Sequence, residues 1–480
     1  MSTASESTAS KTPSSETASL QTLTEQQFLQ HKAFYNKGYT RSLDFRLGQL
    51  TALKKAIQRY ESEIFQALKQ DLGKSNFEAY ATEVGFVLEE IGFIHKHLSQ
   101  WIKPESVKTP LVHQPAQSEV IYEPRGVTLI IAPWNYPFQL LIDPLIGAIA
   151  AGNCALLKPS ELTPHTSAVM ARLIQETFDS AYISVMEGGI DVNQDLLDQP
   201  FDLIFFTGST RVGKIVMEKA AKHLTPVILE LGGKSPCIVD RGVPLDLTAR
   251  RIVWGKFLNA GQTCVAPDYV LVPREDLDAL CEAMAHEITR FYGADPLLSP
   301  DYGRIVSADR VRHLQELLAH EGAEQIVCGG HTDVAQRYFA PTLVKHVDPE
   351  APLMQEEIFG PILPILPYDH LDDVMDFVQE RPRPLALYLF SENEAHQEML
   401  TQYLDFGGGC INDAMIHLAT PHLPFGGKGS SGMGAYHGKY SFEAFSHRKA
   451  LLKRPLKLDM PLRYPPYPAW KEKVVRQVMK

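Results

Sequence analysis

The sequence has 480 residues, of which 44% are hydrophobic and 21% charged, and its net charge is −11 at pH 7. This length predicts two or three lobes, and the hydrophobic content is typical of a globular protein and excludes disorder of the bulk. The acidic balance argues against nucleic acid as the main partner, because a polyanion would meet a repulsive field.

The first segment, residues 1–21, is rich in Ser, Thr and Ala and contains Glu6 and Glu16. It has no apolar stretch of the kind found in secretory signals, and its acidic residues disfavour a transit peptide, so we expect a disordered tail. An amphipathic helix with a core-facing stripe is predicted next, with Gly73 as its stop. Its apolar positions at helical spacing are Leu50, Leu53, Ile57, Tyr60, Ile64 and Leu68.

From residue 127 onward, short apolar runs alternate with helical stretches. Thr163 is predicted to cap a helix that has Pro164 in its first position. Strands are predicted over 127–132, 155–158, 202–206 and 226–229, and helices over 138–151, from 164 and up to 222. This alternation predicts a parallel, doubly wound sheet, in which ligands bind beyond the carboxyl ends of the strands. A second α/β stretch runs from about 233 to 404.

The cysteines form no CxxC pair and no dense framework; they are Cys154, Cys237, Cys264, Cys281, Cys328 and Cys410. We therefore expect reduced thiols, a cytoplasmic location and no structural metal site. The longest apolar stretch, 140–157, is interrupted by Asp143, Pro144, Gly152 and Asn153, so no bilayer-spanning segment is expected.

Two motifs could carry chemistry, and each also has a plain structural explanation. Gly208-Ser-Thr-Arg-Val-Gly213 joins a strand to a helix, where glycine admits a ligand and the helix N-terminus attracts phosphate. Taken alone, the motif is weak evidence, and an ordinary strand-to-helix turn is the favoured interpretation. Cys264 in Gly261-Gln-Thr-Cys264 is either a nucleophile or a small buried hydrophobe.

Two further polar residues lie at ends of predicted strands. Glu230 ends an apolar strand before two glycines, where it is a solvated charge or, beside a thiol, a general base. Asn135 lies between Pro133 and Pro137, where its amide either stabilises a turn or donates to an oxyanion.

These residues fall within longer blocks that resemble the aldehyde dehydrogenase superfamily, most closely its class III branch, from about Phe28 to Pro466. Chance agreement across so many ordered blocks is negligible. The blocks are Pro133-Trp-Asn-Tyr-Pro-Phe138, Leu229-Glu-Leu-Gly-Gly-Lys-Ser-Pro236, Gly261-Gln-Thr-Cys-Val-Ala-Pro-Asp268, Gln355-Glu-Glu-Ile-Phe-Gly-Pro361 and Leu423-Pro-Phe-Gly-Gly427.

The resemblance implies NAD(P)-dependent oxidation of aldehydes to carboxylic acids, with Cys264 as the nucleophile. Thiolate addition makes the aldehyde carbon tetrahedral, and Asn135 Nδ2 and the Cys264 backbone N–H stabilise the oxyanion. Hydride transfer to the nicotinamide leaves a thioester, which water activated by Glu230 hydrolyses. Losing one oxyanion donor typically costs roughly 10²–10³ in rate, and general-base help contributes roughly 10²–10⁴.

The resemblance also places the cofactor. The expected contacts are Lys158 and Glu161 for the adenosine ribose, Gly208, Ser209 and Gly213 for the pyrophosphate, Trp134 and Leu231 for the cleft, and Glu357 and Phe359 for the nicotinamide ribose and ring. NAD is expected to be preferred and NADP tolerated, because Glu161 would repel a 2′-phosphate and Lys158 would offset part of that charge.

A mostly apolar substrate tunnel is implied as well, which favours medium- to long-chain aliphatic or aromatic aldehydes. Its expected walls are Phe86, Tyr136, Met415, Ile416, His417 and Phe425. Because aromatic and Met side chains are common in protein cores, packing alone is the alternative for these residues.

The implied architecture is an α/β aldehyde dehydrogenase fold with a Rossmann-like cofactor domain, an α/β catalytic domain and a small bridging arm. The expected bounds are 22–104 and 125–231 for the cofactor domain, 232–419 for the catalytic domain, 105–124 and 420–449 for the arm, and 450–480 for a C-terminal tail. Class III members are typically homodimers, so a homodimer bridged by the arm is expected.

The tail is unusually basic. From His447 onward there are ten Lys or Arg and only Asp459 and Glu472 to oppose them, and an apolar face is formed by Trp470, Val474, Val475 and Val478. A solvated tail that lies partly across the partner subunit is favoured. Weak, reversible contact with anionic lipid is the alternative, to which each basic residue would contribute about 1 kcal/mol.

Other functions of the same fold remain open at this point. An esterase or an acylating enzyme would use the same cysteine, and a non-catalytic protein could retain the fold. Glu230 favours hydrolysis over acyl transfer to a thiol, and the joint presence of Cys264, Glu230 and Asn135 argues against a non-catalytic protein.

Overall fold

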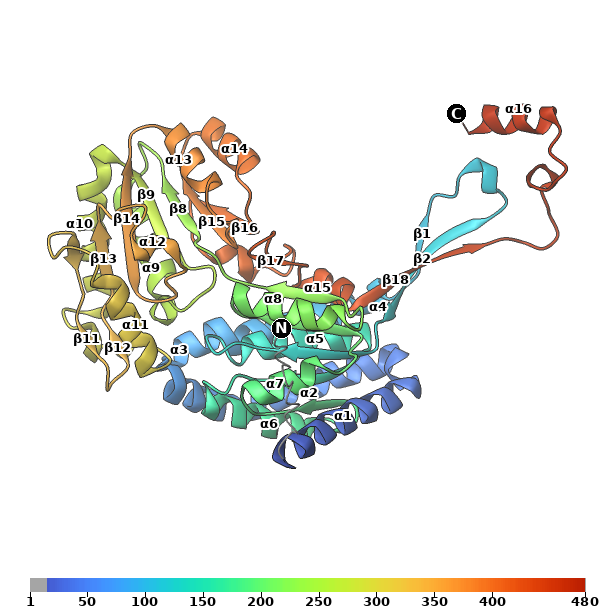
Figure 1. Cartoon of the computed structure of the whole chain (residues 1–480), viewed down its shortest axis with the longest axis horizontal. Helices are drawn as coiled ribbons and strands as arrows, with labels where there is room; N and C mark the ends of the chain where they lie inside the picture. Colours follow the sequence, from blue (N-terminus) through green and yellow to red (C-terminus); the bar gives the residue numbers. More distant parts are fainter. Residues whose placement is uncertain (1–14, 480) are drawn as a thin grey trace, which may run out of the picture.

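The computed structural model describes residues 15–479, with side chains from residue 22 onward. Two α/β lobes lie side by side, and a thin arm extends from the first lobe (Figure 1). The lobes contain a six-stranded and a seven-stranded sheet, and the arm contains a three-stranded sheet. The predicted α/β class with parallel sheets is confirmed.

The six-stranded sheet of the first lobe has the order β17-β7-β6-β3-β4-β5, in which β17 is antiparallel to β7 and the others are parallel. Most of its parallel strands are continuous apolar runs buried on both faces, as a helix-covered parallel sheet requires. The strands are β3 (Val127–Ile131), β4 (Cys154–Lys158), β5 (Ile183–Val185), β6 (Leu203–Thr207), β7 (Val227–Glu230) and β17 (Gly432–Met433). The four strands predicted in this region are therefore present.

Helices connect and cover this sheet. The predicted amphipathic helix is part of α2, which ends at Gly73 in the left-handed conformation (φ 70°). The helices of this lobe are α1 (Ser15–Asn36), α2 (Leu43–Leu72), α3 (Asn76–Ala79), α4 (Gly85–Trp101), α5 (Gln139–Ala151), α6 (Pro164–Thr177), α7 (Ile190–Leu197), α8 (Thr210–Ala221) and α15 (Gly438–Ala444). A single π-helical turn, Tyr80–Val84, separates α3 from α4.

The predicted cap of α6 is only half correct. Thr163 occupies the N-cap position with Pro164 after it, but its side chain makes no capping hydrogen bond. The carboxylate of Asp71 caps the helix instead, since it accepts from the backbone N–H groups of His165 (3.3 Å) and Thr166 (2.8 Å). An acceptor from another helix thus satisfies the free donors of the first turn.

The seven-stranded sheet of the second lobe has the order β10-β13-β14-β9-β8-β15-β16, parallel except for β10. Its strands are β8 (Pro236–Val239), β9 (Tyr269–Pro273), β10 (Ile326–Cys328), β13 (Thr342–Lys345), β14 (Ile362–Tyr368), β15 (Ala386–Phe390) and β16 (Gly408–Ile411). Its helices are α9 (Leu245–Phe257), α10 (Leu277–Tyr292), α11 (Ala308–Leu318), α12 (Pro352–Gln355), α13 (Leu371–Gln379) and α14 (Glu394–Tyr403), and a small ribbon pairs β11 (Thr332–Asp333) with β12 (Tyr338–Phe339).

The arm consists of β1 (Glu105–Val107), β2 (Gln117–Pro124) and β18 (Ser446–Lys453), and β18 pairs with β2 along its whole length. The segment 420–449, expected in the arm, is divided between two places. Its first part carries β17 onto the six-stranded sheet and α15 onto α5, and only β18 belongs to the arm. The expected arm boundary at 449 also falls inside β18, which runs on to Lys453.

The chain ends in α16 (Ala469–Val478), which lies at the far tip of the arm (Figure 1). The expected disordered tail, 1–21, falls outside the described residues up to residue 14, and α1 begins at Ser15. Across the described residues, no helix is both long and apolar enough to cross a bilayer. All six cysteines are free.

Candidate active site

The expected catalytic residues converge at the carboxyl edge of the six-stranded sheet. The segment with Asn135 follows β3, and Glu230 is the last residue of β7. Cys264 comes from the second lobe, where a tight turn after α9 carries the chain across to this edge. The geometry of parallel strands therefore brings together residues that are far apart in the sequence.

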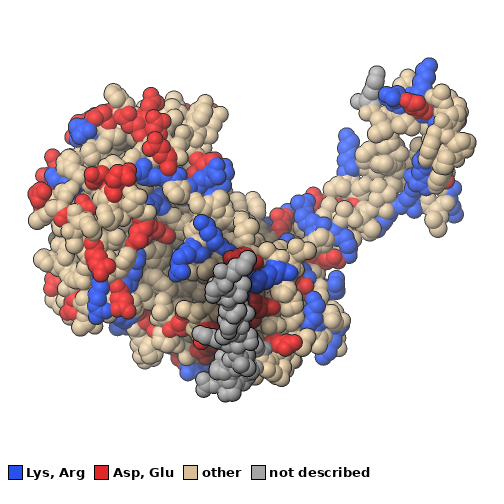
Figure 2. Space-filling view, viewed as in Figure 1, with Lys and Arg blue, Asp and Glu red and all other residues tan. Residues whose placement is uncertain are grey.

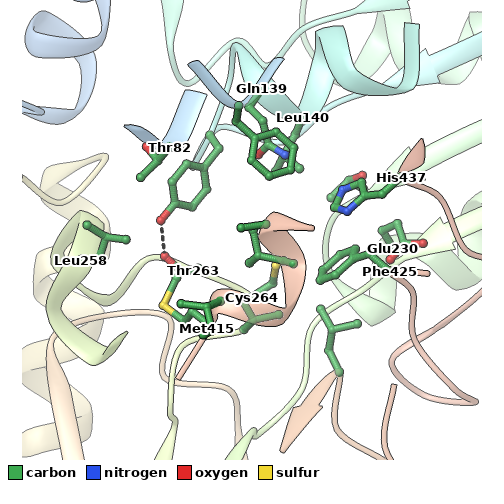
Figure 3. A pocket seen from close by; sticks show the side chains of 18 of the residues that line it. Thr82, Gln139, Leu140, Glu230, Leu258, Thr263, Cys264, Met415, Phe425 and His437 are labelled. Carbon is green, nitrogen blue, oxygen red and sulfur yellow. Dashed lines mark hydrogen bonds between the residues drawn. The ribbon is translucent and has the colours of Figure 1, made fainter. Parts of the chain in front are cut away.

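Cys264 and Glu230 both border two adjoining hollows. One, here called the apolar cavity, has a volume of about 170 Å³. The other, called the cleft, has a volume of about 380 Å³. Figure 3 shows the apolar cavity, with Cys264 and Glu230 among its walls. A thiol and a carboxylate shared by two hollows can act on a molecule bound in each.

The Cys264 thiol is half-buried, and its surroundings hold it in the neutral form. Burial raises its pKa to about 12, and the nearby carboxyl groups of Glu357 and Glu230 act in the same direction. The backbone N–H groups of Cys264 and Val265 act in the opposite direction, because they donate towards the sulfur. These two donors are in place to stabilise negative charge that develops at this point.

Glu230 is 2% exposed, and neither of its carboxylate oxygens has a hydrogen-bond partner among the described residues. Burial alone raises its pKa well above the ordinary value for Glu. A carboxylate with free acceptor sites at the wall of a cavity can take a proton from water. Its raised pKa brings it closer to the range in which a general base works well.

Asn135 is buried, and its side-chain amide donates to the backbone carbonyl of Gln262 (3.0 Å), two residues before Cys264. The next residue, Tyr136, shares a hydrogen bond with Thr263 (2.7 Å), which is the dashed line in Figure 3. The segment after β3 is thus held against the cysteine loop, which places the Asn135 amide beside Cys264 at the wall of the cleft.

Most of the residues expected to bind a cofactor line the cleft. These are Trp134, Gly208, Ser209, Leu231, Glu357 and Phe359. The rings of Trp134 and Phe359 meet edge to face at 5.3 Å. The Ser209 hydroxyl accepts from Val212 N–H and caps α8, whose N-terminus therefore opens at the cleft. Burial raises the pKa of Glu357 to about 8.

Three expected cofactor residues lie outside the lining of the cleft. Lys158 is buried at the end of β4, where its Nζ donates to the Pro159 carbonyl and lies 3.5 Å from a carboxylate oxygen of Glu161. Burial lowers the Lys158 pKa, although Glu161 opposes that effect. Gly213 lies in the first turn of α8, where a Cβ would come within 2.7 Å of the Leu231 side chain. Gly213 thus lets α8 approach β7.

Five of the six expected tunnel residues line the apolar cavity: Phe86, Tyr136, Met415, Ile416 and Phe425. His417 does not, because its ring packs against Tyr388 and Phe425 and its Nδ1 lies 3.5 Å from the Cys410 sulfur. Burial lowers the His417 pKa to about 4, so the ring is neutral near pH 7.

Several residues of the two hollows were not predicted from the sequence. The apolar cavity also has Gln139, Trp254, Thr263, Tyr436 and His437 in its wall, and the cleft has Arg310 and Glu356. His437 follows a glycine-rich run, and its ring stacks on Phe425 (5.2 Å between centroids). Glu356 lies in the block 355–361 and Thr263 in the block 261–268, so their neighbours in the sequence could have indicated them.

Comparison with known proteins agrees with this geometry. The family model described as aldehyde dehydrogenase family matches residues 35–451. The chain belongs to the aldehyde dehydrogenase family. The 4,4'-diaponeurosporen-aldehyde dehydrogenase of Staphylococcus aureus is 52% identical to it, over 92% of this chain and 96% of that protein.

Two further comparisons agree. The mouse protein named aldehyde dehydrogenase, dimeric NADP-preferring, is 47% identical over 91% of this chain and 96% of its own. The structure of the substrate-bound state of Staphylococcus aureus AldH matches with a TM-score of 0.93 and 52% identity, covering 95% of this chain and 99% of that one. The enzyme oxidises aldehydes to carboxylic acids and uses NAD(P).

Proposed function

We propose that this dehydrogenase oxidises large apolar aldehydes through a thioester on Cys264, with Glu230 as the base that releases the acid. One observation carries the proposal: Cys264 and Glu230 border both the cleft and the apolar cavity. An aldehyde carbon that enters from the cavity reaches the thiol at the place where the cleft ends.

The chain's own groups divide the chemistry among them. The Cys264 thiol loses its proton to solvent, the resulting thiolate forms the new C–S bond, and the carbonyl electron pair moves to oxygen. Asn135 Nδ2 and the backbone N–H of Cys264 hold that oxyanion, a type of interaction worth roughly 10²–10³ in rate per donor. Glu230 takes a proton from the water that adds to the thioester, and the C–S bond then breaks to release the carboxylic acid.

The cleft suits NAD(P) chemically. The N-terminus of α8 offers free N–H donors to a pyrophosphate, and Trp134 and Phe359 supply flat apolar walls for the nicotinamide. When bound, the nicotinamide supplies the hydride acceptor. We propose that NAD is preferred and NADP tolerated, because Glu161, with 44% of its side chain exposed, would face a 2′-phosphate.

The apolar cavity favours a long or bulky hydrocarbon chain. Most of its wall surface is aliphatic and aromatic, with only a few polar groups such as Gln139 and Thr263, so most hydroxyl or charged groups of a polar aldehyde would lack partners there. A panel of aldehydes tests this: kcat/KM from NADH absorbance should rise with chain length. Equal values for glycolaldehyde and decanal would contradict it.

We further propose a cytoplasmic homodimer bridged by the arm. In the described sheet β18 has an unpaired edge, and Leu451, Leu452, Leu456 and Leu458 are exposed on it or after it. An exposed edge strand with apolar side chains is a template for pairing with another chain. Light scattering should give twice the chain mass for the intact protein, and a monomer mass would contradict the proposal.

The tip of the arm carries the basic C-terminal tail, and its contact with anionic lipid can be tested. Figure 2 shows Lys and Arg side chains along the arm and at its tip, and Trp470, Val474 and Val478 are exposed on α16. We propose that this face rests mainly on the partner subunit. Truncation after Pro468 should leave the protein in the supernatant with anionic vesicles at low salt, as should the intact chain. Sedimentation of the intact chain alone would favour the lipid alternative.

A further inference from the structure

A fully buried ion pair lies behind the segment that carries Asn135. Lys74 Nζ is 2.6 Å from Glu83 Oε1, and both side chains have no exposed surface. Neither residue lines the apolar cavity or the cleft. Such a pair contributes little net stability, because desolvation offsets the attraction. What it does provide is a set of directed contacts, and these all point to one segment.

Lys74 holds the start of this segment. Its ammonium donates to the backbone carbonyl of Asn135 (3.1 Å) and lies 3.9 Å from the centre of the Tyr136 ring. A hydrogen bond from a charged donor is stronger than a neutral one, and the aromatic face adds a cation–π contact. The position of the Asn135 backbone, and therefore the reach of its side chain, depends on this ammonium.

Glu83 holds the end of the same segment. Its second carboxylate oxygen accepts from the backbone N–H groups of Phe138 (2.9 Å) and Gln139 (3.2 Å), at the start of α5. These are unpaired donors of a helix N-terminus, where negative charge is favourable. One ion pair thus fixes both ends of the short connection between β3 and α5.

Asn259 ties this connection to the cysteine loop. Its side-chain amide donates to the carbonyl of Asn135 (2.8 Å) and to that of Gln262 (3.2 Å), the same carbonyl that receives the Asn135 amide. Asn259 has a φ of 52° and a ψ of 33°, a left-handed conformation that Asn tolerates better than most residues. One side chain therefore sets the two segments that carry the oxyanion donors relative to each other.

We propose that Lys74, Glu83 and Asn259 are positioning residues that set the Asn135 amide against the Cys264 loop for oxyanion stabilisation. This inference rests on the proposed oxyanion role of Asn135. Each of the three acts through the segment that carries Asn135, and none of them lines either hollow. Their loss should therefore slow the first chemical step and leave the reactivity of the thiol and the binding of NAD unchanged.

The first test uses Asn259→Gly, since glycine accepts the left-handed backbone and only the amide is lost. The rate of NADH formation in the first turnover, measured by rapid mixing, should fall between about tenfold and 10²-fold, the scale of a small misplacement. The KM for NAD and the rate of Cys264 alkylation by iodoacetamide should stay within about twofold. Ala260→Gly is the matched control, because Ala260 also has a φ of 52° but no amide, and it should react like the unmodified enzyme.

The second test replaces the ion pair as a unit. Lys74→Met with Glu83→Gln removes both buried charges and keeps an acceptor for the Phe138 and Gln139 N–H groups. This double variant avoids an unpaired buried charge, which would threaten folding. Its first-turnover rate should fall in the same range as that of Asn259→Gly, with circular dichroism and NAD affinity unchanged. A normal rate in this folded variant would overturn the assignment of Lys74 and Glu83.

Combination with Asn135→Ala separates positioning from general damage. Alone, Asn135→Ala should slow the first turnover roughly 10²–10³-fold. In that background Asn259→Gly should cost less than about twofold, because the amide that it positions is gone. An equal loss in both backgrounds would overturn this inference and leave the role of Asn135 intact. An Asn135→Ala variant with normal turnover would overturn the oxyanion role itself, and the inference with it.

Discussion

The cleft and the apolar cavity share Cys264 and Glu230 in their walls, yet they are built in different ways. The cleft is framed by strand ends and by backbone, as at Gly208, Gly232 and the N-terminus of α8. The cavity is framed by side chains from helices and loops of both lobes, as Phe86 and Met415 show. The sheet therefore fixes the reaction and the cofactor, whereas the segments packed around it fix the substrate.

The largest effect is expected where both hollows meet. Cys264→Ser should abolish NAD-dependent oxidation, because a serine hydroxyl is far less acidic than a thiol and a far weaker nucleophile than the thiolate. Folding and NAD affinity should survive, as checked by circular dichroism and titration. Cys328 is a half-buried thiol on β10, so Cys328→Ser is the matched control and should keep full activity. Normal turnover in folded Cys264→Ser would remove the thioester mechanism.

Glu230→Gln should leave thioester formation fast and make thioester hydrolysis slow. The thioester should form, and its hydrolysis should slow roughly 10²–10⁴-fold because no base activates the water. Rapid mixing should show a burst of NADH followed by slow turnover, and intact-protein mass spectrometry should detect the acyl adduct. The absence of an adduct together with a normal steady-state rate would show that another group is the base.

A smaller effect, about tenfold per pH unit, is expected from the thiol. The pKa of Cys264 is raised to about 12, so the thiol is protonated at neutral pH and the thiolate fraction grows as pH rises. The rate constant for alkylation of the cofactor-free enzyme by iodoacetamide should therefore rise steadily from pH 7 to pH 10. A plateau in the alkylation rate constant below pH 9 would contradict this raised pKa. It would mean that the cleft stabilises the thiolate despite the neighbouring carboxyl groups.

The smallest effect should be confined to the cofactor. Glu161→Gln removes a charge that we expect to repel a 2′-phosphate, so kcat/KM for NADP relative to NAD should rise several-fold, by about 1 kcal/mol or less at this exposed position. Activity with each aldehyde at saturating NAD should not change. A constant NADP to NAD ratio would mean that Glu161 points away from the adenosine ribose, as its position outside the cleft lining allows.

The sequence predicts the features that depend on neighbouring residues and does not predict those that depend on residues far away in the chain. Four strands of the first sheet (β3, β4, β6 and β7) and the convergence of Asn135 and Glu230 at one edge follow from local apolar runs and the rule for parallel sheets. The cap of α6 could not be predicted, because it comes from Asp71 on a distant helix. His417 was misplaced for a similar reason: the short turn of Ile416–Ala419 directs its ring away from the cavity.

The positioning residues show the same limit more clearly. Lys74 and Glu83 are charged residues in a helical region, where sequence reasoning expects solvent. Their burial arises because the segment at Lys74, before α3, and the π-helical turn that carries Glu83 pack against the connection between β3 and α5. Asn259 lies close to Cys264 in the sequence, but its left-handed backbone and its contact with Asn135 arise only when the lobes meet.

The pairing of β17 with β7 limits how this enzyme could be redesigned. Residues 415–437 supply much of the cavity wall, so exchanging this segment with that of a relative is a direct route to a new substrate range. Gly432 lies opposite Glu230, however, and a Cβ there would come within 2.2 Å of the Leu229 carbonyl. A graft that replaces Gly432 would push the strand off and displace the base. A new substrate range can therefore be grafted only with a segment that keeps this glycine.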